Sequence, residues 1–158
     1  MADLRGGIDL GGTKIQTAIV DAGGEVVGGA RHPTPTEGGP EDVATAMAAA
    51  LREAAGAAGV ETSELKGVGV GSPGDADEKT GIVSGARNLP GWEGKFPLAQ
   101  NLKEALGTEV KIGNDVQVAT EAEFHLGAGK EFESLIGVFW GTGVGGGLVL
   151  DGRPWLGR

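Results

Sequence analysis

The sequence of 158 residues contains no cysteine and no tyrosine, and aromatic residues make up only 4% of it. Without cysteine the chain has neither disulfide bonds nor cysteine ligands for zinc, and we expect no zinc site in it. No apolar run approaches the roughly 18 residues of a membrane-spanning helix. The N-terminal residues also lack the basic-then-apolar order of a signal peptide. These absences predict a cytoplasmic protein that contacts no membrane.

Basic residues are few as well. The 13 Lys and Arg residues stand against 22 Asp and Glu residues, which gives a formal net charge of -9. An acidic surface repels the phosphate backbone of DNA and RNA. We therefore expect no nucleic acid among the partners of this chain.

Glycine, in contrast, is abundant, with 32 residues. The glycines gather at the ends of apolar runs and follow no three-residue period, which excludes collagen and indicates many tight turns. The alternation of apolar runs with helical patterns predicts an α/β fold. We expect strands at 8–10, 14–20, 25–27, 67–71, 82–83, 109–112, 134–140 and 148–150. We expect helices at 41–58, 96–106 and 114–126, and a proline-containing linker at 32–36.

Two glycine turns join apolar strands, one at residues 11–13 and one at residues 141–147. Each is followed by an acidic turn ten residues after its first glycine, at Asp21 and at Asp151, and the two patterns are offset by 130 residues. Glycine lets backbone N–H groups turn toward an anion. Either turn alone reads best as an ordinary hairpin, but two in the same register favour phosphate binding.

Two stretches, 69–74 and 141–146, have the glycine spacing of a dinucleotide fingerprint. That fingerprint requires its third glycine to open a helix, whose N-terminus receives the pyrophosphate. A turn-like run follows the first stretch and a strand follows the second. A nicotinamide enzyme is therefore disfavoured, and the chain contains no P-loop motif either.

Three polar residues have both a structural and a functional interpretation. Asn114 and Asp115 lie between a predicted strand and a predicted helix, where Asn and Asp are common N-caps. Alternatively, Asp115 is a general base that takes a proton from a sugar hydroxyl, and Asn114 binds hydroxyls. Asn88 is a polar turn residue or a further hydroxyl ligand. Asp9, at the end of the first strand, is a candidate ligand for Mg²⁺ through water.

Five segments, in this order along the chain, resemble the motifs of the ROK family of sugar kinases and sugar-responsive repressors, and most closely those of its bacterial glucokinases. They are Asp9-Leu10-Gly11-Gly12-Thr13-Lys14, Gly71-Ser72-Pro73-Gly74, Asn88-Leu89-Pro90-Gly91-Trp92, Asn114-Asp115 and Gly141-Thr142-Gly143-Val144-Gly145-Gly146-Gly147. The resemblance implies an actin-like ATPase (ribonuclease H-like) fold, in which two α/β lobes enclose nucleotide and sugar. It places residues 1–113 in the first lobe and residues 114–158 at the opening of the second lobe, including its first hairpin.

The same resemblance implies ATP-dependent phosphorylation of a hexose, most closely glucose, at its 6-hydroxyl, with Mg²⁺. It makes Asp115 the catalytic base. The implied sugar-binding residues are Gly74, Asn88, Asn114 and Asp115. The implied nucleotide-binding residues are Asp9, Gly11, Gly12, Thr13, Lys14, Gly141, Thr142, Gly143 and Gly145, with Asp9 also on Mg²⁺ through water. Relatives of this kind further imply a homodimer.

One departure from the family pattern accompanies these matches. In the family, a Glu-x-Gly-His segment that binds sugar follows the second phosphate turn, and its His can also bind zinc; this sequence contains no such segment. We therefore expect the chain to correspond to the N-terminal half of a glucokinase-like protein. A sugar-sensing regulator is the alternative, although the family's regulators usually carry an N-terminal helix-turn-helix, whereas here the first phosphate strand begins by Ile8. A half-protein that binds without catalysing is a third interpretation. The identity of the hexose, and the choice between ATP and polyphosphate as phosphoryl donor, stay open.

Overall fold

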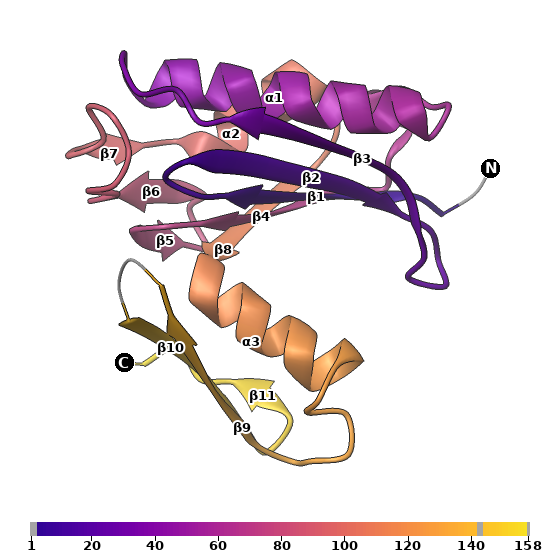
Figure 1. Cartoon of the computed structure of the whole chain (residues 1–158), viewed down its shortest axis with the longest axis vertical. Coiled ribbons are helices and arrows are strands. Elements are labelled where there is room, and N and C mark those ends of the chain that lie inside the picture. Colours follow the sequence, from indigo (N-terminus) through magenta and orange to yellow (C-terminus); the bar gives the residue numbers. More distant parts are fainter. Residues whose placement is uncertain (1–2, 142–143, 158) are drawn as a thin grey trace. The chain divides into compact units, whose positions relative to one another are not determined.

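The computed structural model describes residues 3–141 and 144–157. The chain divides into two compact units, the first ending at Gly113 and the second beginning at Asn114 (Figure 1). Each unit is described by itself. Within the described residues, no helix is long and apolar enough to cross a membrane.

The first unit is built on a five-stranded sheet with the strand order β3-β2-β1-β4-β8. Its strands are β1 (Arg5–Leu10), β2 (Lys14–Val20), β3 (Val26–Pro33), β4 (Val68–Ser72) and β8 (Val110–Asn114). Strands β1, β2 and β3 form an antiparallel meander, whereas β4 lies parallel to β1. The parallel pairing requires a crossover between β3 and β4, and the longest helix provides it.

Helix α1 (Pro40–Ala57) runs along one face of this sheet, and α2 (Leu98–Leu106) contacts α1 (Figure 1). Helix α1 starts with Pro40 at its first position. Its N-terminus is capped by the Asp42 carboxylate, which accepts the Gly39 N–H at 2.9 Å. The apolar residues at helical spacing in α1 are buried, and so are the alternate residues on one face of β2. These residues are Val43, Met47, Ala50, Leu51 and Ala54 in α1, and Ile15, Thr17 and Ile19 in β2.

A smaller three-stranded sheet, with the order β5-β6-β7, follows β4. Its strands are β5 (Asp75–Asp77), β6 (Ile82–Ser84) and β7 (Lys95–Phe96), and a short 3-10 helix (Thr62–Glu64) precedes β4. Trp92 is 1% exposed, donates its indole N–H to the Val83 carbonyl at 3.3 Å and meets the Phe96 ring edge to face at 5.5 Å. This anchor fixes the irregular segment 88–92 against the sheet.

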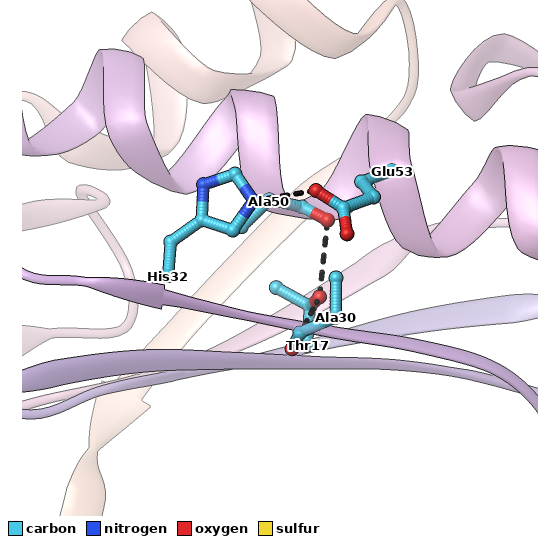
Figure 2. A network of polar contacts seen from close by, with 5 residues as sticks. All are labelled: Thr17, Ala30, His32, Ala50 and Glu53. Atoms are coloured by element: carbon cyan, nitrogen blue, oxygen red, sulfur yellow. Dashed lines mark hydrogen bonds and ion pairs between the residues drawn. The ribbon is translucent and has the colours of Figure 1, made fainter.

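The prediction of a linker at 32–36 is wrong at its start, because β3 extends to Pro33. Strand β3 lies at the edge of the sheet, where a proline costs no ladder hydrogen bond on its outer side. His32 contacts Glu53 of α1 with a distance of 2.7 Å between Nε2 and Oε2. Figure 2 shows this pair beside the buried Thr17 hydroxyl, which donates to the Ala50 carbonyl at 3.1 Å.

The second unit pairs helix α3 (Asp115–Leu126) with a three-stranded antiparallel sheet. The strands are β9 (Leu135–Trp140), β10 (Val144–Leu150) and β11 (Arg153–Pro154), in the order β11-β10-β9. This meander has the same strand order as β3-β2-β1, which matches the repeat seen in the sequence. Gln117 joins α3 to β10, because its amide exchanges two hydrogen bonds of 3.2 Å with the backbone of Leu148.

The face of β9 and β10 that points away from α3 carries large exposed apolar side chains. Ile136, Val138, Trp140 and Val144 are 67–87% exposed, and Trp140 pairs with Val144 across the two strands. Trp140 therefore is no core residue within the described part of the chain, unlike Trp92. An apolar patch of this kind marks an interaction surface.

We expect this patch to make the isolated chain self-associate. The double variant Ile136→Thr, Val138→Thr keeps β-branched side chains in β9 and removes two apolar surfaces. It should lower both the apparent molecular mass in light scattering and the binding of an apolar dye. A wild-type chain that stays monomeric at high concentration and binds no dye would contradict this expectation.

Candidate functional site

The first glycine turn connects β1 with β2 at one end of the five-stranded sheet. The Gly11 N–H donates to the Lys14 carbonyl at 2.9 Å and closes the turn. Because the Gly11 N–H is hydrogen-bonded within the turn, an anion would have to be bound by the backbone N–H groups of the residues after Gly11. Asp9 is exposed and lies on the sheet face opposite to the buried side chains of Ile8 and Leu10, since side chains alternate along β1.

Asn88, a predicted sugar ligand, lies directly against this turn. A Cβ atom added to Gly12 would lie 3.1 Å from Nδ2 and 3.2 Å from the carbonyl oxygen of Asn88. The structure therefore brings together two residues that the sequence separates by 76 positions. Gly12 serves as a spacer in addition to any contact with phosphate, because a side chain there would push Asn88 away.

If Asn88 binds hexose as the resemblance implies, Gly12→Ala should weaken that binding by about 5- to 100-fold, the range for overpacking a tight contact. Calorimetric titration with the sugar measures this effect. Gly69→Ala is the matched control, because nothing lies within 4 Å of a Cβ at that position. Equal sugar affinities of both variants and the wild type would show that Gly12 does not position Asn88.

Gly74 lies between β4 and β5, in the second predicted sugar-binding segment. Its φ angle of +87° belongs to the left-handed region, and an added Cβ would lie 2.6 Å from the Ser84 carbonyl oxygen. Only glycine fits this position without strain. The segment is thereby held against Ala86, two residues before Asn88.

Asn114 and Asp115 occupy the N-terminus of α3. The Asn114 Oδ1 accepts the N–H groups of Val116 and Gln117 at 3.2 Å each, so its predicted capping role is confirmed. Asp115 is partly buried, and its Oδ1 accepts the Val116 N–H at 2.9 Å. This contact fixes the orientation of the carboxylate. Both residues belong to the second unit, whereas the glycine turn at 11–13 and Asn88 belong to the first.

The second glycine turn is shorter than the sequence suggests. Strand β10 already begins at Val144, and Gly145 pairs with Phe139 in the sheet instead of lying in a turn. A Cβ on Gly145 would lie 2.7 Å from the side chain of Val116, so this glycine allows α3 to approach the sheet. Gly141 is exposed at the end of β9, while Thr142 and Gly143 lie outside the described residues.

Lys14, the last residue of the first motif, is the first residue of β2 and is partly buried. It pairs with Pro33 of β3. Thr34, which follows Pro33, is 4% exposed and contacts the glycine turn, although no sequence pattern selects it as a site residue. A polar residue between two prolines, here Pro33 and Pro35, is typical of a linker, and only the pairing of β3 shows otherwise.

Asp77, in β5 close to Gly74, has a carboxyl pKa below its usual value. The Thr80 hydroxyl is the main cause, followed by the backbone N–H groups of Lys79 and Thr80. Because the folded state holds the charged form, this contact stabilises above the unfolded pKa and is lost as the pH falls through the folded pKa. The group is exposed, so the effect on folding is small.

Asp9 is the metal ligand that the sequence suggests. Over 3–141 and 144–157, no group of three or more His, Asp or Glu side chains converges as a metal site. Asp9 thus stays a predicted Mg²⁺ ligand that acts through water, with the nucleotide phosphates supplying further oxygens.

Comparisons with known proteins identify the family of this chain. The model of the ROK family matches residues 5–158. The glucokinase of Thermotoga maritima is 34% identical over 96% of this chain, and the N-acetyl-D-glucosamine kinase of Pectobacterium atrosepticum is 36% identical over 96% of it. These alignments cover 46% and 48% of the two relatives, so the chain spans about half the length of the curated relatives it matches.

A solved structure shows the same fold. The ROK family glucokinase from Streptomyces griseus, in complex with glucose and AMPPNP, is 32% identical with a TM-score of 0.86. The match covers 98% of this chain and 47% of that one. The actin-like ATPase fold expected from the resemblance is confirmed by this match and by the family model. The chain belongs to the ROK family.

Proposed function

We propose that this chain carries the nucleotide-phosphate turn and part of the hexose site of an ATP-dependent sugar kinase. The observation that carries the proposal is the contact between Gly12 and Asn88. It puts a backbone turn suited to phosphate beside an amide suited to sugar hydroxyls, as phosphoryl transfer between the two ligands requires. Kinases among the relatives support it.

The residues at the first turn fit a nucleotide. Glycine at positions 11 and 12 lets the backbone approach phosphate oxygens, and Thr13 adds an exposed hydroxyl. The exposed Asp9 carboxylate lies at the end of the preceding strand, in reach of a hydrated cation. Mg²⁺, when bound, neutralises charge that develops on the transferred phosphoryl group.

Asp115 is the proposed general base. Its carboxylate takes the proton of the sugar 6-hydroxyl as that oxygen forms a bond to the γ-phosphorus of ATP and the bond to the ADP oxygen breaks. The Val116 N–H holds Oδ1 at 2.9 Å, and the proposal assigns the proton to Oδ2. Asn88 and Asn114 would bind other sugar hydroxyls, with Gly74 shaping the wall beside Asn88.

The proposed substrate is glucose, and N-acetyl-D-glucosamine is the first competitor, because kinases of both sugars are among the relatives. The homodimer that the resemblance implies stays a prediction, as does the location in the cytoplasm.

Calorimetric titration of the chain with Mg-AMPPNP and with each sugar tests the proposal. We expect saturable binding of both ligands, and Asn88→Ala should weaken sugar binding by at least about tenfold, since it leaves sugar hydroxyls unpaired. Asn101→Ala, in α2, is the matched control and should bind sugar as the wild type does. A folded chain that binds sugar but no Mg-AMPPNP would favour the sugar-sensing regulator.

A further inference from the structure

The segment between β3 and α1, residues 34–39, touches two loops of the candidate site. The Thr34 hydroxyl donates to the Gly11 carbonyl at 2.7 Å, and the Thr34 N–H donates to the Thr13 carbonyl at 3.2 Å. At the other end of the segment, the Gly38 carbonyl lies 2.9 Å from where a Cβ on Gly91 would stand. One short segment thus contacts both the glycine turn and the segment that carries Asn88.

The two hydrogen bonds of Thr34 determine where the turn's amides point. A trans peptide unit is planar, so its C=O and N–H groups point in opposite directions. Because Thr34 holds the Gly11 carbonyl, the N–H of Gly12, in the same peptide unit, points away from Thr34. The hydrogen bond from the Thr34 N–H to the Thr13 carbonyl likewise fixes the peptide unit between Thr13 and Lys14. Together they hold the glycine turn from one side and present the Gly12 amide on the other.

Burial makes this arrangement specific. Thr34 is 4% exposed, so its hydroxyl costs free energy when it is left without a hydrogen-bond partner, while Gly11 is partly buried and Thr13 is exposed. Water does not easily replace a hydrogen bond at such a position. In a glycine-rich turn the backbone has many alternative conformations. A contact from outside the turn that removes them lowers the entropic cost of binding a ligand there.

We propose that Thr34 is a positioning residue that holds the first glycine turn in the conformation that receives nucleotide phosphate. The identity of the ligand, nucleotide phosphate, rests on the proposed function. The positioning of the turn by Thr34 rests on the geometry of the first unit alone. Thr34 acts through the Gly12 amide and does not touch the nucleotide.

Three variants of the full chain test this role. Thr34→Val keeps the side-chain shape and removes the hydroxyl, whereas Thr34→Ser keeps the hydroxyl. Thr17→Val removes another buried hydroxyl that donates to a backbone carbonyl, between β2 and α1, and serves as the matched control. NMR hydrogen exchange of the Gly11 amide reports the turn, and calorimetry with Mg-ATP reports its ligand.

We expect Thr34→Val to raise the exchange rate of the Gly11 amide and to weaken Mg-ATP binding, each by about 3- to 10-fold, as the loss of one hydrogen bond predicts. Thr34→Ser should restore both values, and Thr17→Val should change neither beyond its effect on global stability. Equal exchange of the Gly11 amide in Thr34→Val and Thr17→Val, at matched stability, would overturn the proposal.

The two claims fail in different ways. A wild-type chain that binds no Mg-ATP contradicts the proposed function, while the exchange rates still decide whether Thr34 positions the turn. Should Thr34→Val fail to fold, native-state exchange of the wild type replaces it. The Thr34 and Gly11 amides should then open in one step with the same denaturant dependence, and separate openings would overturn the proposal.

Discussion

In a sugar kinase assembled from this chain and the half of a relative that it does not match, replacing Asp115 with asparagine should lower hexose-dependent ADP release by about 10²- to 10⁴-fold, the contribution of the proposed general base. Asparagine keeps the size of the side chain but cannot accept the proton of the 6-hydroxyl. The fold should survive, because Asn114 provides the N-cap of α3 through Oδ1. The lost interaction between a charged residue and the helix N-terminus costs about 0.3–1 kcal/mol.

Asp151→Asn is the matched control for this experiment. Asp151 also belongs to the second unit, lies exposed in the turn after β10 and has a φ angle of 49°, which asparagine tolerates. ADP release by this variant should match the wild type. If Asp115→Asn keeps its release and changes only its affinity for sugar, the residue is a ligand, and the base must be sought elsewhere.

Trp92→Ala should lower the free energy of unfolding by about 3–5 kcal/mol, as expected for truncation of a fully buried large aromatic side chain. The variant loses the edge-to-face contact with Phe96, leaves the Val83 carbonyl without its indole donor and opens a cavity under segment 88–92. Urea denaturation followed by circular dichroism measures the change. Trp92→Phe keeps an aromatic ring, so its free energy of unfolding should fall far less. The lost hydrogen bond accounts for about 1 kcal/mol, and the smaller volume of phenylalanine adds to it.

The same substitution should affect the site, because Asn88 begins the segment that Trp92 anchors. Under conditions where Trp92→Ala is still folded, hexose affinity should fall more than the affinity for Mg-AMPPNP. Loss of stability without any change in sugar affinity would mean that Gly12 and Gly74 suffice to hold Asn88. A change below about 1 kcal/mol would contradict the buried position of Trp92 itself.

The sequence predicts the parts of the fold that depend on periodicity. Apolar residues at helical spacing give α1, and alternation gives the inward face of β2. It fails for β3, where Pro33 suggests a linker and only the edge position of the strand makes proline acceptable. It also fails for Gly145, since a glycine that admits a helix onto a sheet looks the same in sequence as a glycine in a turn.

For the candidate site, the sequence supplies residue types and order but no proximity. Nothing in the spacing of Gly12 and Asn88 shows that they touch, because their contact depends on the pairing of β1 with β4 and on the burial of Trp92. Thr34 is missed for a related reason. Its importance lies in two hydrogen bonds to a distant turn, and a lone threonine carries no pattern that reveals them.

Supplying the half of a relative that this chain does not match tests the proposed kinase function directly. Residues 1–158 are fused to the unmatched half of the Streptomyces griseus glucokinase, and ADP release from Mg-ATP is followed with and without glucose. We expect ADP release that requires glucose, a product phosphorylated on the 6-hydroxyl, and loss of both in the Asp115→Asn fusion. A folded fusion that binds glucose and Mg-AMPPNP but forms no glucose 6-phosphate would contradict it.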